Sequence, residues 1–284
     1  MPEVSSGGVP IRWEEVGSPT GQPVLLVHGF ASNGAQNWLR SGWENPLSEA
    51  GIRAIVVDLR GHGRSGRPAG REHYGSDLFV ADLVAAIDAA GGEQVGYLGY
   101  SLGARLGWDL AIAHPDRIGR LVLGGFAVRS PMRDFDVEAA RSWISQGTAV
   151  ADPLTRGLLE VAALVPDNDL ARLVDVVEGV SSDELEAVAN GPVPSPPTCI
   201  INGERDTTAT GGAALAAEIG AEYVELKARS HSSAVSSHRF KEAAIAWLKG
   251  SPAPVDDRRD LRIRGVASGS SQPGHRPATR KAQS

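Results

Sequence analysis

The sequence predicts an α/β fold built on a mostly parallel, doubly wound sheet. Of its 284 residues, 42% are hydrophobic and 22% are charged, which is typical of a globular protein and enough for one large α/β core or two small domains. Short aliphatic runs alternate along the chain with helical patterns, and several of these runs are apolar almost throughout. Strands have this character when helices bury both faces of a parallel sheet. Alternating strands and helices are typical of doubly wound folds.

Six strands are expected, each a β-branched or aliphatic run bounded by turn residues. The runs cover 24–28, 52–58, 95–100, 121–125, 198–202 and 223–227. Between them, apolar residues after Ser76 recur at i, i+3, i+4 and i+7, and Ser76 is a candidate N-cap. Another helix is expected over 101–114, and the last core helix is expected to end at Gly250.

The segment 126–196 interrupts this rhythm and is much longer than the usual connection between two strands. Helical periodicity recurs in it at 137–144, 154–165 and 170–177. We therefore predict an α/β core formed by 1–125 and 197–250, with 126–196 as a helical cap over the strand ends. Residues 251–284 are rich in Ser, Gly, Pro, Arg and Gln, and they predict a disordered tail.

Charge and cysteine content limit the partners that we expect. The chain has 34 acidic and 28 basic side chains, so it lacks the basic footprint of a nucleic-acid-binding protein. Cys199 is its single cysteine, which excludes an intramolecular disulfide and a thiolate metal cluster. No run approaches the ~20 apolar residues of a membrane span, and residues 1–10 lack a signal-peptide pattern. We expect a cytoplasmic protein with no cofactor and no metal.

The strongest chemical signal lies between the strand 95–100 and the helix after it. Gly99-Tyr100-Ser101-Leu102-Gly103 fits the pattern Gly-x-Ser-x-Gly, in which a sharp turn exposes the serine hydroxyl. Side chains two positions before and after the serine would collide in such a turn, and Gly99 and Gly103 avoid this. The alternative is a serine that only caps the helix. The strand before it and the helix after it favour a nucleophile at Ser101.

An oxyanion hole needs two backbone N–H groups that point at one position. One should belong to Leu102, the residue after the nucleophile. We assign the other to Phe30, in the loop after the strand 24–28, with Gly29 allowing a close approach. By itself, His28-Gly29 would be read as a turn, but its pairing with the Ser101 motif favours an oxyanion site.

These motifs together resemble the α/β-hydrolase superfamily, in its capped esterase-like branch, over about residues 8–250. In chain order they are His28-Gly29-Phe30, Asp58-Leu59-Arg60-Gly61-His62-Gly63-Arg64-Ser65, the Ser101 motif, His114-Pro115, Gly203-Glu204-Arg205-Asp206 and Ser230-His231. Each motif alone is weak evidence. Their combination is strong, and the order Ser, Asp, His agrees with the family.

The resemblance implies that Asp206 is the acid and His231 the general base of a catalytic triad. Glu204 is the nearest rival for the acid, and the structural alternative for Asp206 is an Asx turn. The resemblance assigns His62 to the scaffold. Ser230 departs from the family, which usually has glycine before the histidine.

We therefore expect hydrolysis of a small or medium carboxylic ester, mostly apolar, through an acyl-enzyme on Ser101. A thioester, a lactone or a carbon–carbon bond could be cleaved by the same triad. A different class is a small-ligand receptor without catalysis, because fold does not imply function. Serine at position 101 argues against a haloalkane dehalogenase or an epoxide hydrolase, because a resemblance to those enzymes would require aspartate at this position. Four apolar residues of the predicted cap are candidates either for pocket walls or for core positions: Trp143, Leu158, Leu159 and Leu164. We favour core positions for most of them.

Overall fold

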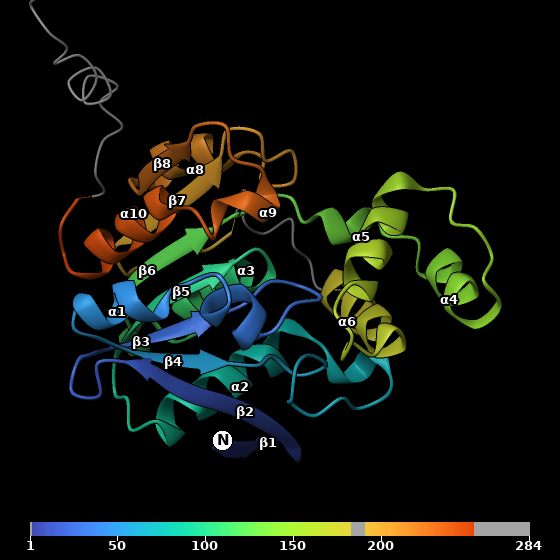
Figure 1. The fold of residues 1–284 in the computed structure, drawn as a ribbon, viewed down its shortest axis with the longest axis horizontal. Coiled ribbons are helices and arrows are strands. Elements are labelled where there is room, and N and C mark those ends of the chain that lie inside the picture. Colours follow the sequence, from blue (N-terminus) through green and yellow to red (C-terminus); the bar gives the residue numbers. More distant parts are fainter. Residues whose placement is uncertain (1, 183–190, 253–284) are drawn as a thin grey trace, which may run out of the picture. The chain divides into compact units, whose positions relative to one another are not determined.

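An eight-stranded sheet forms the centre of the computed structural model, which describes residues 2–182 and 191–252 (Figure 1). The strands are β1 (Glu3–Ser6), β2 (Val9–Gly17), β3 (Gln22–Val27), β4 (Ile52–Val57), β5 (Val95–Tyr100), β6 (Ile118–Gly124), β7 (Thr198–Gly203) and β8 (Glu222–Leu226). Their order across the sheet is β1-β2-β4-β3-β5-β6-β7-β8. β2 pairs antiparallel with β1 and β4, and every other pair is parallel. The predicted mostly parallel sheet is confirmed.

Helices bury both faces of this sheet. In the part of the chain that the structure describes, the α-helices are α1 (Glu44–Glu49), α2 (Ser76–Ala89), α3 (Leu102–Ala113), α4 (Val137–Gln146), α5 (Pro153–Ala163), α6 (Leu170–Ser182), α8 (Gly212–Ile219), α9 (His231–Ala234) and α10 (His238–Leu248), and α4, α5 and α6 do not lie on the faces of the sheet. Leu25 and Val27 of β3 belong to the core shared with α2, α3 and α8, whereas Val24 and Leu26 belong to the core shared with α1 and α10. Because neighbouring residues of this strand are buried on opposite faces, it is continuously apolar from Val24 to Val27.

The sequence does not predict the N-terminal hairpin formed by β1 and β2. In β2 the apolar residues Val9, Ile11 and Trp13 are buried, and the more accessible Pro10, Arg12 and Glu14 alternate with them. This alternation is the pattern of a strand with one buried face, and a search for continuous apolar runs passes over it. The six expected strands all form, with ends within three residues of the predicted ones.

Helices α4, α5 and α6 lie between β6 and β7, in the segment predicted as a cap, and Figure 1 shows them beyond the carboxyl ends of the parallel strands. Each of the three begins at an aspartate whose side chain accepts a backbone N–H: Asp136 from Ala139, Asp152 from Thr155 and Asp169 from Arg172. The division into core, cap and tail stays a prediction. From residue 253 onward, the predicted tail lies outside the described residues.

The single cysteine, the length of the helices and the arrangement of possible metal ligands can be compared with the expectations from the sequence. Cys199 is buried in β7, and burial raises the pKa of its thiol to about 12, which makes it inert. Within residues 2–182 and 191–252, no helix combines the length and apolar character that a membrane crossing requires. The same residues contain no group of three or more His, Cys, Asp or Glu side chains placed to bind a metal ion.

Candidate active site

Ser101 stands in the sharp turn between β5 and α3. Its backbone has φ 55° and ψ −115°, a conformation that residues other than glycine rarely adopt. A Cβ atom at Gly99 would lie 2.2 Å from the carbonyl oxygen of Gly103, and one at Gly103 would lie 2.3 Å from that of Val27. Glycine at both positions permits strand and helix to approach this closely. The turn therefore presents the hydroxyl at the carboxyl end of β5.

Three side chains from distant parts of the chain meet at this end of the sheet. The Nε2 atom of His231 lies 3.0 Å from Oγ of Ser101, and its Nδ1 atom lies 2.7 Å from Oδ2 of Asp206. Asp206 follows β7, and His231 begins α9 shortly after β8. One imidazole thus connects the hydroxyl to the carboxylate, in the arrangement of a Ser-His-Asp triad.

The Asp206 carboxylate is fixed on both oxygens, and its side chain has no exposed surface. Its Oδ1 atom accepts the backbone N–H groups of Thr208, at 3.0 Å, and Ala209, at 2.9 Å. Burial by itself raises the pKa of Asp206, but the hydrogen bond and charge of His231 and the two N–H groups lower it, and the net pKa lies below its usual range. The Asx turn considered as an alternative is thus present on the same residue that holds His231.

The rival acid, Glu204, and a second histidine seven residues after His231, His238, both point elsewhere. Glu204 accepts the backbone N–H of Ala228 at 2.7 Å and is about 42% exposed. The side chain of His238 is 84% exposed and lies 3.1 Å from Glu242, one turn further along α10. Neither side chain reaches the triad.

Tyr100, which the sequence does not single out, supports the histidine. Its hydroxyl donates to the backbone carbonyl of His231, and the two rings lie 5.4 Å apart. Burial raises the pKa of Tyr100 far above its usual range, so the phenol remains a donor. On the other side, the N–H of Ser230 donates to Oγ of Ser233 at 3.0 Å, within the turn that begins α9. The position before the histidine therefore accommodates serine here.

The two backbone groups expected to form an oxyanion hole flank Ser101. Leu102 is the first residue of α3, and N–H groups in a first helical turn have no acceptor in their own helix. A Cβ atom at Gly29 would lie 3.1 Å from Cβ of Ser101, so the loop that contains Phe30 passes directly against the serine. The roles of the Phe30 and Leu102 N–H groups stay predictions.

His28 holds this loop from the side of the core. Its Nε2 accepts the N–H of Leu59 at 3.1 Å, so Nδ1 carries the proton and donates to the carbonyl of Gly29 at 2.8 Å. Burial lowers the pKa of His28 to about 4, which keeps the ring neutral. His62 packs against the rings of His28 and Phe30, and burial together with the charge of His28 lowers its pKa to about 3. Neither histidine contacts Ser101, in line with a scaffold role.

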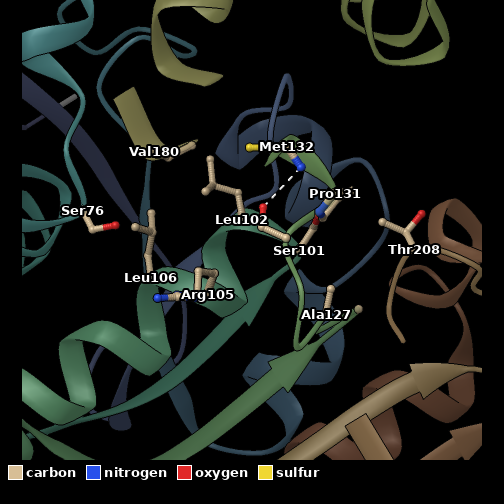
Figure 2. A pocket seen from close by; sticks show the side chains of 12 residues that line it. Ser76, Ser101, Leu102, Arg105, Leu106, Ala127, Pro131, Met132, Val180 and Thr208 are labelled. Atoms are coloured by element: carbon tan, nitrogen blue, oxygen red, sulfur yellow. Dashed lines mark hydrogen bonds between the residues drawn. The ribbon is translucent and has the colours of Figure 1, made fainter. Parts of the chain in front are cut away.

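A small cavity of about 50 Å³ lies at Ser101 (Figure 2). Its apolar lining comes from Leu102, Leu106, Ala127, Pro131, Met132 and Val180, and its polar lining from Ser76, Arg105, Ser130 and Thr208. Arg105 is held by Asp109 of the same helix, with Nε 3.0 Å from the carboxylate. The cavity therefore offers a short, largely apolar space beside the hydroxyl.

The residues considered as cap walls do not line this cavity. Leu159 is buried in the core, whereas Leu164 is 79% exposed. The segment 126–196 instead contributes Ala127, Ser130, Pro131, Met132 and Val180. Two apolar members of this set are Met132, in a 3-10 helix near the start of the segment, and Val180, near the end of α6. No periodicity distinguishes these two apolar residues from core residues, so the sequence alone could not select them.

Comparisons with known proteins agree with this architecture. The family model described as alpha/beta hydrolase fold matches residues 22–146. Epoxide hydrolase 3 of Siraitia grosvenorii is 38% identical over 122 residues, which are 42% of this chain and 36% of that protein. Epoxide hydrolase A of Mycobacterium tuberculosis is 34% identical over 118 residues, which are 40% of this chain and 35% of that protein. The matches thus span little more than a third of the length of these curated relatives.

Solved structures resemble the chain over more of its length. The enol-lactonase of Burkholderia xenovorans LB400 has a TM-score of 0.71 and 24% identity, covering 87% of this chain and 100% of the other. An epoxide hydrolase of Vigna radiata has a TM-score of 0.69 and 22% identity, covering 88% and 97%. At these identities the likeness shows a shared fold.

Proposed function

From the α/β-hydrolase fold, which this chain adopts, we propose that it is a serine hydrolase that cleaves small carboxylic esters through an acyl-enzyme. The observation that carries the proposal is the hydrogen-bonded series of Ser101, His231 and Asp206 at the end of the sheet. A hydroxyl is a weak nucleophile unless a base removes its proton, and the imidazole lies at the distance this requires.

In the first half-reaction, Oγ of Ser101 attacks the ester carbonyl carbon while its proton passes to Nε2 of His231. The carbonyl electrons move onto oxygen, and the N–H groups of Phe30 and Leu102 stabilise this oxyanion. When the carbonyl reforms, the carbon–oxygen bond to the alcohol breaks, and His231 returns the proton to the departing alcohol. Asp206 keeps the proton on Nδ1 and stabilises the imidazolium.

In the second half-reaction, water replaces the alcohol. His231 takes a proton from the water, whose oxygen attacks the acyl carbon, and the bond to Oγ breaks as the proton returns to Ser101. The products are a carboxylic acid and the free enzyme. Both steps use the same groups, so no cofactor is required.

Serine at position 101 favours an ester over the epoxide named for several relatives. An alkoxide that opened an epoxide would remain joined to the product by an ether, which an imidazole and water do not cleave. A carboxylate nucleophile would instead leave an ester, which they do cleave. The hydroxyl of Ser101 therefore supports acyl transfer, and the small apolar cavity beside it supports a short acyl group.

The experiment is turnover of p-nitrophenyl esters of graded chain length, beside a lactone, a thioester and styrene oxide. We expect the short esters to be cleaved fastest and the epoxide to remain intact. A fluorophosphonate probe should label Ser101, and Ser101→Ala should abolish both labelling and turnover. Ser145→Ala, which changes an exposed serine of α4 outside this cavity, is the control and should retain both. Epoxide opening without ester cleavage would contradict the proposal.

A further inference from the structure

The loop that contains Phe30 is a tight turn with a strained residue in it. The N–H of Ser32 donates to the carbonyl of Gly29 at 3.3 Å and closes a four-residue turn. Ala31, third in that turn, has φ 58°, a position that a type II turn normally gives to glycine. A residue held this way persists only where its surroundings fix it. Whatever holds Ala31 therefore also sets the orientation of Phe30 beside it.

A side chain from between α5 and α6 supplies the contact. The Nδ2 group of Asn168 donates to the carbonyl of Ala31 at 2.8 Å and to the carbonyl of Ala162 at 3.0 Å. An amide NH₂ has two hydrogens, so this one group joins the turn after β3 to the last turn of α5. The contact links residues 137 positions apart in the chain, so it forms only when the chain is folded.

Packing reinforces the same connection. Ala31, Ala162 and Leu173 form a small buried cluster, each at most 3% exposed, and Phe30 packs against it. Leu173 belongs to α6, so both helices that flank Asn168 touch the turn. The position of Ala31 is thus determined by the α5–α6 pair as well as by the core.

We infer that Asn168 is a positioning residue for the oxyanion hole, an inference that rests on the proposed function. His28 fixes the peptide before Phe30 through the carbonyl of Gly29, and Asn168 fixes the peptide after Ala31. The Phe30 N–H belongs to the peptide that His28 holds, and the strained Ala31 connects this half of the turn to the peptide that Asn168 holds. Loss of the amide donor leaves Ala31 free to relax, so the N–H is less well aimed at the oxyanion, whose charge develops only in the transition state.

The test compares Asn168→Asp and Asn168→Ala, which both lack the donor, with Thr155→Val as a matched control. Thr155 is buried in α5, where its Oγ1 accepts the N–H of Asp136 at 2.9 Å, away from the turn. We would measure kcat and KM on a short aryl ester, the Ki of a boronic acid that forms a tetrahedral adduct with Ser101, and the melting temperature of each variant.

Both Asn168 variants should lose about tenfold in kcat and a similar factor in boronic acid affinity, with KM changed less than about twofold. Thr155→Val should keep the wild-type kcat, KM and Ki, even if its melting temperature falls as much as that of the Asn168 variants. Equal losses in the control, or a loss confined to KM, would overturn the inference. An active wild type with unchanged Asn168 variants would contradict this inference alone, whereas a wild type that cleaves no ester would contradict the proposed function and this inference with it.

Discussion

Nδ1 of His231 lies 2.7 Å from Oδ2 of Asp206, and of the two side chains only the histidine, at 30% exposure, meets solvent. The buried carboxylate is held by two further N–H groups, so it cannot follow the ring if the ring turns. This fixed partner sets which nitrogen of His231 carries the proton and which faces Ser101.

The two histidines of the C-terminal region should therefore differ sharply. We expect His231→Ala to lower kcat by about 10³-fold or more, because triad members act as a unit. His238→Ala should change kcat little, since that side chain is exposed and lies 3.1 Å from Glu242 of the same helix. Kinetics of both variants on one activated ester measure this, and the base is misassigned if His238→Ala is the inactive enzyme.

Asp206→Asn should cost little further activity when it is added to His231→Ala, because an orienting group has no effect without the base it orients. Alone, it should reduce kcat by at least about 10²-fold. Glu204→Gln, two residues earlier and outside the triad, is the control and should stay near wild type. Additive losses in the double variant would show that Asp206 acts by another route.

Gly99→Ala should destabilise the protein by roughly 3 kcal/mol, since its Cβ would meet backbone 2.2 Å away, which no side-chain shift relieves. Gly157→Ala is the matched control, because nothing lies within 4 Å of its Cβ and it stands inside α5. There alanine should stabilise by about 0.5–1 kcal/mol. Urea unfolding measures both, and equal stabilities would refute the steric argument.

Acid should destabilise the fold through its buried histidines. The pKa of His28 is lowered from 6.5 to about 4 and that of His62 from 6.5 to about 3, so the unfolded chain binds protons that the native one refuses. Their contribution is complete above pH 6.5 and is lost as pH falls, toward 4 for His28 and toward 3 for His62, at about 1.4 kcal/mol for each pKa unit of each histidine. Unfolding free energy measured from pH 7 to 4 should decline, and His62→Gln should make the decline shallower. An equal slope in both would contradict this.

Incubation with EDTA should leave ester turnover unchanged, because the proposed acyl transfer uses only side-chain and backbone groups. Activity before and after dialysis against the chelator measures this. Activity that EDTA removes and a divalent cation restores would refute the metal-free mechanism.

The sheet and the Ser101 turn were predictable because their signals are local, whereas Asp206 and His231 were expected only from the combined resemblance to the family. A strand buried on both faces is a continuous apolar run, and the Ser101 turn needs two glycines at fixed spacing. The hairpin of β1 and β2 escaped prediction because its apolar residues alternate with polar ones, and such alternation over a few residues is a weaker signal.

The contacts that hold the site could not be predicted, since no local pattern encodes them. Asn168 meets Ala31 across 137 residues, and an asparagine in a turn between helices has a sufficient local explanation. The hydroxyl of Tyr100 meets the backbone of His231 across 131 residues. Only the three-dimensional arrangement shows that such residues touch the loops that present the reacting groups.

Because β6 pairs directly with β7, the segment that connects them is an insertion between two neighbouring strands of the sheet. Leu121 of β6 is paired with Thr198 of β7, so the whole segment between them leaves and re-enters the sheet on neighbouring strands. The entropic cost of closing such a segment rises only about 0.6 kcal/mol with each doubling of its length. Recombination could therefore exchange this segment and alter substrate preference while Ser101 and His231 stay in place. On the inference above, a grafted segment would also need its own donor for the carbonyl of Ala31.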